Sequence, residues 1–186
     1  SCTYCIKINY NSDMKKYIFI PYNDSYPKLY QEEEQILKKI LGNDVLIEHI
    51  GSTAVPRLGG KGIVDIMIAV PRDQMQSISD SVQKAGYEYK QSGGNKERIF
   101  HQRDENNING DLVRFHLHIT FPESNTWRED IAFRDYLRNN PEDAKHYAEI
   151  KKKAAKESNQ SKEKYMVIKE PIIQAILQKA LQLKDL

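Results

Sequence analysis

The stretch that decides the fold is Glu48–Ile68, with the sequence EHIGSTAVPRLGGKGIVDIMI. The mostly apolar run at 45–50 predicts a short buried strand, and a Gly-Ser turn and a loop follow it. Residues 63–70 predict the strongest strand of the chain, yet Asp65 interrupts its apolar pattern. A carboxylate in such a strand is costly unless it is paired or bound to a cation. Asp65 is therefore the first candidate functional residue.

The Gly-Ser turn adds a candidate phosphate site beside this strand. Gly51 has no side chain at a place where a phosphate could approach the backbone, and Ser52 offers a hydroxyl and an N–H group. Ser52 can also cap a short helical turn, and helix N-termini favour anions. A carboxylate next to a phosphate cradle is a common way to hold Mg²⁺ on a nucleotide. We therefore expect Gly51 and Ser52 to bind a nucleotide and Asp65 to bind Mg²⁺ or Mn²⁺.

The rest of the chain predicts strands first and helices afterwards. We expect strands at 17–20, 87–91, 97–103 and 112–120, with a polar loop at 105–110, and helices from Pro27 to about Leu41, capped by Ser25, and from Pro71 to about Ala85. From about residue 124 the pattern is helical, Asn140-Pro141 divides the first two helices, and the last helix spans roughly 163–183. The fold class that this pattern predicts is α/β (α+β), followed by a C-terminal helical segment.

Length and composition indicate a single domain. The 186 residues divide into a candidate N-terminal extension at 1–13, an α/β core at 14–122 and a helical segment at 123–186 that packs on the core. Cys2 and Cys5 fall in the extension and lack a second ligand pair for zinc. A body without cysteine fits the reducing cytoplasm.

Charge and hydropathy restrict the partners. The 28 Lys+Arg and 26 Asp+Glu leave a net charge of +2, too balanced for bulk nucleic-acid binding. No apolar run approaches the roughly 20 residues that a membrane helix needs. We expect the protein to bind a small nucleotide or another phosphorylated ligand, and we expect no membrane partner. The sequence does not indicate the oligomeric state. The Lys-rich run 151–164 predicts a solvated helix face.

The string EHIGSTAVPRLGGKGIVDIMIAV at 48–70 closely resembles the signature of the GrpB family, an uncharacterised family with a nucleotidyltransferase-like fold. The opening IPYNDSYPKLYQEEEQIL is similar to the family's start, with Tyr26 where Trp is common. RFHLHIT, FRDYLRNNPEDAKHYAEIKKKAA and YMVIKEPIIQAIL are similar to its later blocks, in the same order. The resemblance covers roughly residues 17–180. It implies the nucleotidyltransferase fold, with a mixed, mostly antiparallel sheet, helices on one face and a C-terminal helical segment.

The wider superfamily pattern places a Gly-Ser turn about 9–13 residues before a pair of acids that alternate on a strand. Here 12 residues separate Ser52 from Asp65, but Met67 stands where the resemblance implies the second acid. Alternate strand residues share a face, so a two-metal site of the usual kind lacks a ligand.

The strand at 112–120 offers replacement ligands. Arg114, His116 and His118 alternate onto one face, at about the position where the superfamily has a third carboxylate. Two histidines at this spacing can bind a metal or grip phosphate oxygens, although a solvated edge-strand face gives the same pattern. The predicted catalytic and metal-binding residues are therefore Asp65, His116 and His118.

Weaker candidates complete the set of expected ligand-binding residues. Lys61, Arg98 and Arg114 could reach the same phosphate. Lys169 could also reach it if the last helix folds back. His49 could be a ligand or a hydrogen-bonded core residue.

The leading function hypothesis is transfer of a nucleotidyl group from a nucleoside triphosphate to an unknown acceptor. The alternative is a protein that binds a nucleotide or phosphometabolite without catalysis, which Met67 favours. Metal-dependent hydrolysis at His116 and His118 is a third hypothesis.

Overall fold

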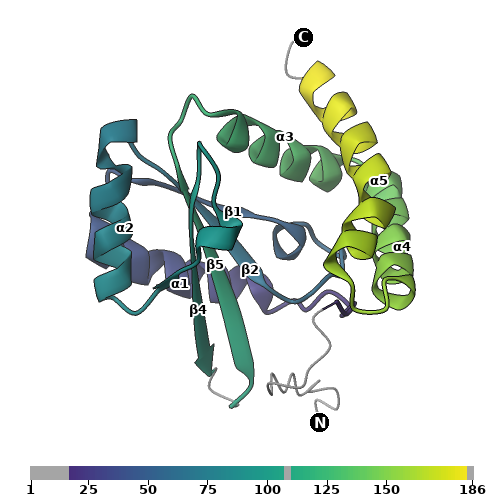
Figure 1. The fold of residues 1–186 in the computed structure, drawn as a ribbon, viewed down its shortest axis with the longest axis horizontal. Helices are drawn as coiled ribbons and strands as arrows, with labels where there is room; N and C mark the ends of the chain where they lie inside the picture. Colours follow the sequence, from purple (N-terminus) through teal and green to yellow (C-terminus); the bar gives the residue numbers. More distant parts are fainter. Residues whose placement is uncertain (1–16, 107–109, 184–186) are drawn as a thin grey trace.

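The computed structural model of the chain describes residues 17–106 and 110–183. The candidate extension at 1–13, with both cysteines, lies outside the described residues. Figure 1 shows a central sheet with helices packed around it and a helical segment at the C-terminal end of the chain.

Five strands form one mixed sheet in the order β1-β2-β5-β4-β3. Only the pair β2–β5 is parallel, and the other three pairs are antiparallel. This confirms the predicted mixed, mostly antiparallel sheet. The strands are β1 (Leu46–Ile50), β2 (Val64–Ala69), β3 (Glu88–Tyr89), β4 (Ile99–Asn106) and β5 (Leu112–Thr120).

One face of the sheet carries the main hydrophobic core. Alternation along β2 and β5 directs Val64, Ile66, Phe115, Leu117 and Ile119 to this face, where all of them are buried. The helices α1 (Tyr26–Leu41) and α2 (Met75–Lys84) pack against it.

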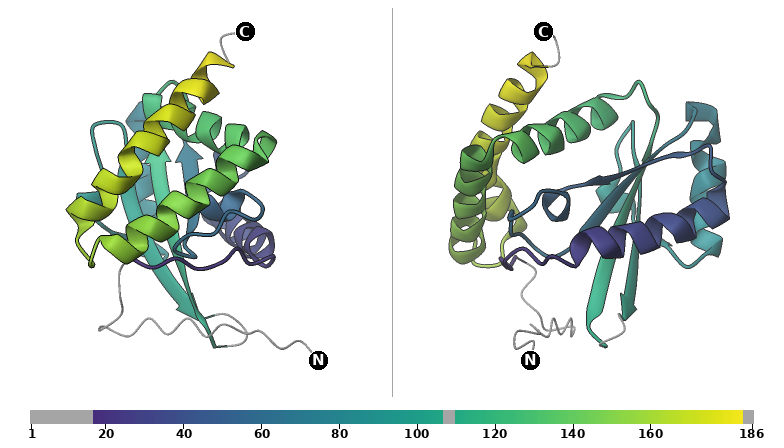
Figure 2. Two further views of the ribbon diagram at one scale, coloured as in Figure 1. Left: turned by 90° about the vertical axis from the view of Figure 1, so that its right-hand side faces the viewer. Right: turned by 180° about the vertical axis from the view of Figure 1, so that it is seen from behind.

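The second face is covered in part by the C-terminal helices, which are α3 (Asn125–Asn139), α4 (Pro141–Glu157) and α5 (Lys162–Gln182). Arg134 of α3 donates hydrogen bonds to the Glu48 carboxylate and the His49 carbonyl, at 2.6 and 2.9 Å, which ties α3 to β1. Figure 2 shows α4 and α5 side by side beyond one end of α3. A second cluster of buried apolar residues joins these helices to the loop after β1. Helices thus flank both faces, and the expectation of helices on one face was incomplete.

Several local predictions differ from the structure. Residues 17–20 form no strand but a single bridge between Ile20 and Gly60, because Pro21 ends the extended segment. Ser25 and Asn140 stand at helix N-termini, but neither side chain caps its helix, whereas Ser124 caps α3 through a 2.9 Å hydrogen bond from the Trp127 N–H. The predicted strand at 87–91 shortens to two residues, and β4 continues through the expected loop to Asn106.

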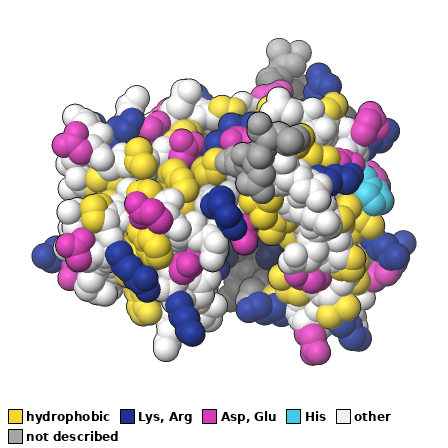
Figure 3. Space-filling view, turned by 90° about the horizontal axis from the view of Figure 1, so that it is seen from above, with side chains coloured by type: hydrophobic (Ala, Val, Ile, Leu, Met, Phe, Trp, Pro, Cys, Tyr) yellow, Lys and Arg dark blue, Asp and Glu magenta, His cyan; other side chains and the backbone are white. Residues whose placement is uncertain are grey.

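The described helices include none with the length and apolar character needed to cross a membrane. On the face shown in Figure 3, basic and acidic side chains are interspersed, in line with the nearly balanced charge of the chain.

Candidate functional site

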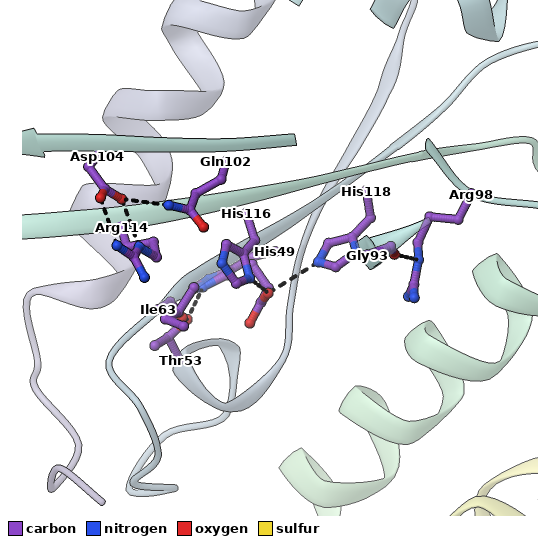
Figure 4. Close-up of polar contacts among 11 residues, drawn as sticks. His49, Thr53, Ile63, Gly93, Arg98, Gln102, Asp104, Arg114, His116 and His118 are labelled. Carbon is purple, nitrogen blue, oxygen red and sulfur yellow. Dashed lines mark hydrogen bonds and ion pairs between the residues drawn. The ribbon is translucent and has the colours of Figure 1, made fainter. Parts of the chain in front are cut away.

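The parallel pairing of β2 and β5 brings Asp65, His116 and His118 together. In the register Asp65 lies beside His116, and Met67 lies beside His118. All of these side chains point away from the main core, and His118 reaches back toward the carboxylate. Asp65 Oδ1 lies 3.3 Å from His116 Nδ1 and 3.1 Å from His118 Nε2. The predicted triad is therefore one cluster, and Figure 4 shows His116 and His118 next to each other in it.

The triad is sheltered but reachable from solvent. The exposed fraction of the side chain is 23% for Asp65, 20% for His116 and 12% for His118. Burial by itself would raise the pKa of Asp65, but hydrogen bonds from both imidazoles outweigh it and hold that pKa well below its usual range. Asp65 is therefore an anion at neutral pH.

The donor set fits one divalent metal ion. The three potential ligand atoms lie within 4.8 Å of one another. Ligand atoms at right angles around an ion with bonds of about 2.1 Å are about 3 Å apart, which matches the distances from Asp65 to the two histidines. One carboxylate and two imidazoles favour a transition ion such as Mn²⁺, Fe²⁺ or Zn²⁺ over Mg²⁺, which prefers oxygen ligands.

The Gly-Ser turn lies directly against the Asp65 carboxylate. Gly51 has φ +72° and ψ −169°, a conformation open essentially to glycine only, and a Cβ there would lie 2.6 Å from Asp65 Oδ2. Ser52 then begins a 3-10 turn, η1 (Ser52–Ala54). The predicted cradle residues and the predicted metal ligand are thus neighbours.

Met67 lies on the same face as Asp65 and has no exposed surface. A second carboxylate at this position would be buried and costly to ionise. Among the described residues, Asp65 is the sole carboxylate of the cluster that could hold a metal ion.

The two predicted arginines lie at different distances from the triad. Arg114 binds both carboxylate oxygens of Asp104, each at 2.7 Å, and Figure 4 shows this pair on the far side of His116 from His118. The structure does not bring Arg114 to the triad. Arg98 donates a 3.1 Å hydrogen bond to the Gly93 carbonyl on the other side, beyond His118.

The sequence pattern did not indicate two charged residues that lie near the triad, Asp130 and Lys151. Asp130 of α3 feels the charges of His118, Arg98 and Asp65, and burial raises its pKa. Lys151 of α4 was expected on a solvated helix face, but it is 4% exposed and its ammonium donates a hydrogen bond to the Gly59 carbonyl. That expectation was wrong because α4 turns this one lysine inward, toward the loop after η1.

The predicted ligand residues Lys61 and Lys169 both lie over the ring of Tyr165. The Lys61 ammonium is 5.3 Å and the Lys169 ammonium 4.6 Å from the centroid of the Tyr165 ring. The charge of Asp65 influences the pKa of Lys169, so α5 does fold back toward the site.

His49 has a structural role. Its ring stacks on Tyr30, and Nε2 lies 2.9 Å from the Thr53 hydroxyl, which donates to the Ile63 carbonyl. Burial lowers the pKa of His49 to about 4, so its imidazole is neutral and holds the turn after β1. His49 is therefore a core residue that positions Gly51 and Ser52.

Sequence comparisons match most of the chain. The sequence model of the family described as "GrpB protein" matches residues 17–179. The UPF0157 protein PA4798 of Pseudomonas aeruginosa is 31% identical over 173 residues, which are 92% of this chain and 70% of that protein. The UPF0157 protein YqkA of Bacillus subtilis is 32% identical over 154 residues, and the match spans 43% of its length.

Structure comparisons agree with the sequence match. The crystal structure of the conserved protein GrpB from Enterococcus faecalis aligns with a TM-score of 0.75 and 33% identity over 90% of this chain and 99% of that one. The Cid1 poly(U) polymerase aligns over 70% of this chain with a TM-score of 0.41 and 15% identity, a similarity too low to carry an argument.

Proposed function

The chain belongs to the GrpB protein family, and from this premise and the geometry around Asp65 we propose that it is a metal-dependent nucleotidyltransferase. The substrate would be a nucleoside triphosphate, and the acceptor a hydroxyl-bearing molecule. The names of its relatives state no reaction, so the proposal rests on the residues of this chain. The observation that carries it is the contact of a three-ligand cluster with a glycine-serine turn.

Each part of the site has a distinct task. Asp65, His116 and His118 would hold one divalent ion, with Mn²⁺ preferred over Mg²⁺ because two ligands are imidazoles. The ion would neutralise charge on the phosphate oxygens of the substrate. Gly51 lets the turn pack directly against the Asp65 carboxylate, and Ser52 would donate hydrogen bonds from its hydroxyl and N–H to a phosphate of the substrate.

The reaction is a displacement at the α-phosphorus. The acceptor oxygen bonds to this phosphorus, the bond to the β-phosphate breaks, and pyrophosphate leaves with the electron pair. The acceptor proton passes to solvent. The residues contribute orientation and charge neutralisation, which supply most of the catalysis in this class of reaction.

A non-catalytic role is the second candidate, and the buried Met67 favours it. With no second carboxylate at that position, the site would retain binding and lose the two-ion chemistry. The protein would then bind the nucleotide or another phosphometabolite without turning it over. If water is the acceptor, the reaction of the first proposal becomes hydrolysis of the nucleoside triphosphate.

The test compares Asp65→Asn with the parent and with Asp73→Asn, a control at an exposed acid in the 3-10 turn Arg72–Gln74 that follows β2. Calorimetry would measure binding of Mn²⁺ with a non-hydrolysable nucleoside triphosphate. We expect at least a tenfold loss of affinity in Asp65→Asn only, since loss of even a supporting group costs 10- to 100-fold. Equal affinity in all three proteins would refute the metal assignment.

A pyrophosphate-release assay separates the two candidates. Release with some hydroxyl acceptors, abolished in Asp65→Asn, supports the transferase. Tight binding without release across a broad acceptor panel, and without hydrolysis, supports the binding protein.

A further inference from the structure

A pocket of about 350 Å³ opens between three segments that are far apart in the sequence. Its lining comes from the N-terminal segment at 19–22, from the loop after η1 at 56–59 and from one face of α4. We call it the outer pocket. Its volume falls in the range of roughly 300–1,000 Å³ that small-molecule sites occupy in proteins.

The outer pocket is separate from the metal-binding triad. Among the described residues, its lining includes no member of the triad and neither residue of the Gly-Ser turn. The loop reaches that turn only later, at Gly60, where a Cβ would overlap the Ser52 hydroxyl. A ligand in the outer pocket would therefore leave the proposed nucleotide site free.

Rings form the apolar wall of the outer pocket, and backbone contacts hold this wall in place. The lining contains four residues with rings, Phe19, Pro21, Tyr22 and Pro56. Two hydrogen bonds between the backbones of Ile20 and Gly60, of 2.6 and 2.9 Å, join the N-terminal segment to the loop. Gly59 packs so closely on the Phe19 ring that a Cβ would overlap it. The wall is thus preformed and suits a flat apolar ligand.

The lining also carries three cations and one carboxylate. The carboxylate of Glu149 pairs with Lys152 at 2.8 Å. Arg57 and Lys145 are exposed, and in the part of the chain that the structure describes neither forms an ion pair. The outer pocket therefore offers two cations that an acidic ligand can reach.

Arg57 has a backbone conformation that arginine rarely adopts. The Leu58 N–H donates a 3.1 Å hydrogen bond to the Val55 carbonyl and closes a turn with Pro56 second and Arg57 third. The φ of Arg57 is +67°, and a turn of this kind usually has glycine or asparagine in the third place. Strain of this kind is typical of ligand-binding positions. Here it holds a guanidinium at the pocket.

We propose that the outer pocket binds a small organic anion, which has a flat apolar body and one carboxylate or phosphate group. The apolar body packs on the wall of rings. The acidic group pairs with Arg57 and Lys145, since a guanidinium binds either group through two parallel hydrogen bonds. Both parts of the ligand are needed, because a neutral ring leaves the cations unused and a simple anion leaves the wall exposed.

The experiment measures the binding of four probes to the full chain without metal. Naphthoate and naphthyl phosphate carry the rings and the charge, naphthamide lacks the charge, and acetate lacks the rings. Calorimetry measures the affinities. Nuclear magnetic resonance locates the site through the backbone amides of Gly59 and Ala148, which line the pocket, and of Gly51, which does not.

Two variants test the cations. They are Arg57→Gly and Lys145→Met, with Lys153→Met as the control, because Lys153 is exposed on α4 and is outside the lining. Glycine adopts a positive φ without strain, so Arg57→Gly should raise the urea midpoint of unfolding while it weakens binding. A lower midpoint would show that Arg57 supports the fold and would overturn its assignment to a ligand.

We expect naphthoate or naphthyl phosphate to bind at least tenfold more tightly than naphthamide and acetate, and the tighter of the two identifies the acidic group. Arg57→Gly and Lys145→Met should each lose at least fivefold in affinity, and Lys153→Met should not. Equal affinity for naphthamide, unchanged affinity in either pocket variant, or amide shifts at Gly51 in place of Gly59 and Ala148 would overturn the proposal. None of these readouts involves Asp65, so the result does not depend on the proposed function.

Discussion

Replacing Lys151 by methionine tests the buried ammonium directly. The variant removes the charge, keeps most of the aliphatic volume and leaves the ring of Tyr147 in contact with an apolar chain. It also removes the hydrogen bond to the Gly59 carbonyl. The loss of that hydrogen bond costs about 1–3 kcal/mol at any pH. The charge effect, in contrast, depends on pH.

The expected magnitude follows from the pKa of Lys151, which burial lowers from 10.5 to about 7. Between these two values the unfolded chain holds a proton that the folded protein has released, so raising the pH raises the free energy of unfolding. The folded state is penalised by about 4 kcal/mol at pH 7 and by about 2 kcal/mol at pH 9. The parent should therefore gain about 2 kcal/mol over this range relative to Lys151→Met.

Urea unfolding of both proteins at pH 7, 8 and 9 measures this difference, with Lys152→Met as the exposed control. Subtracting the variant removes the contributions of titrating groups that do not interact with Lys151. Lys169 lowers the pKa of Lys151 through its charge, so its coupling to Lys151 is part of the measured difference. We expect the difference between parent and Lys151→Met to change with pH and that between parent and Lys152→Met to stay constant. Parallel curves for the parent and Lys151→Met would show that the ammonium is solvated, contrary to our reasoning.

Two further predictions concern the turn and the ligand. Gly51→Ala should cost about 1–3 kcal/mol in the free energy of unfolding and weaken Mn²⁺ binding, because its Cβ would lie 2.6 Å from Asp65 Oδ2 at φ +72°. Gly86→Ala, at φ +95° with open space around the new Cβ, should lower stability in urea and leave Mn²⁺ binding unchanged; equal Mn²⁺ loss in both would refute the contact. Binding of a nucleoside triphosphate at pH 8 should take up protons, because its phosphates raise the lowered pKa values of Lys151 and Lys169. Calorimetry in buffers of different ionisation enthalpy measures this uptake, and an enthalpy independent of the buffer would contradict it.

Local periodicity predicted the two strands that carry the triad, and the family resemblance supplied the type of sheet. Alternation along 112–120 put His116 and His118 on one face, and the apolar run around Asp65 marked a buried strand. In the structure these two strands are adjacent, so the side chains of Asp65, His116 and His118 on their shared face come into contact.

The burial of Lys151 could not be predicted in the same way, because it depends on how helices pack. Lys151 has lysine neighbours in the sequence, and nothing in that run distinguishes the buried member from the exposed ones. Arg114 shows the opposite case: it shares a strand face with the histidines, but Asp104 on the neighbouring strand binds its guanidinium. Lys151 is buried because of helix packing, and Arg114 is held by a partner on the neighbouring strand. The pattern of a single sequence records neither contact.

The most direct test of the metal site is pulsed electron paramagnetic resonance of Mn²⁺ bound to the full chain. If Asp65, His116 and His118 hold the ion, the spectrum contains nitrogen couplings from two imidazoles, and His118→Gln retains only one of them. A Mn²⁺ spectrum without nitrogen coupling, or one unchanged by His118→Gln, would contradict the account.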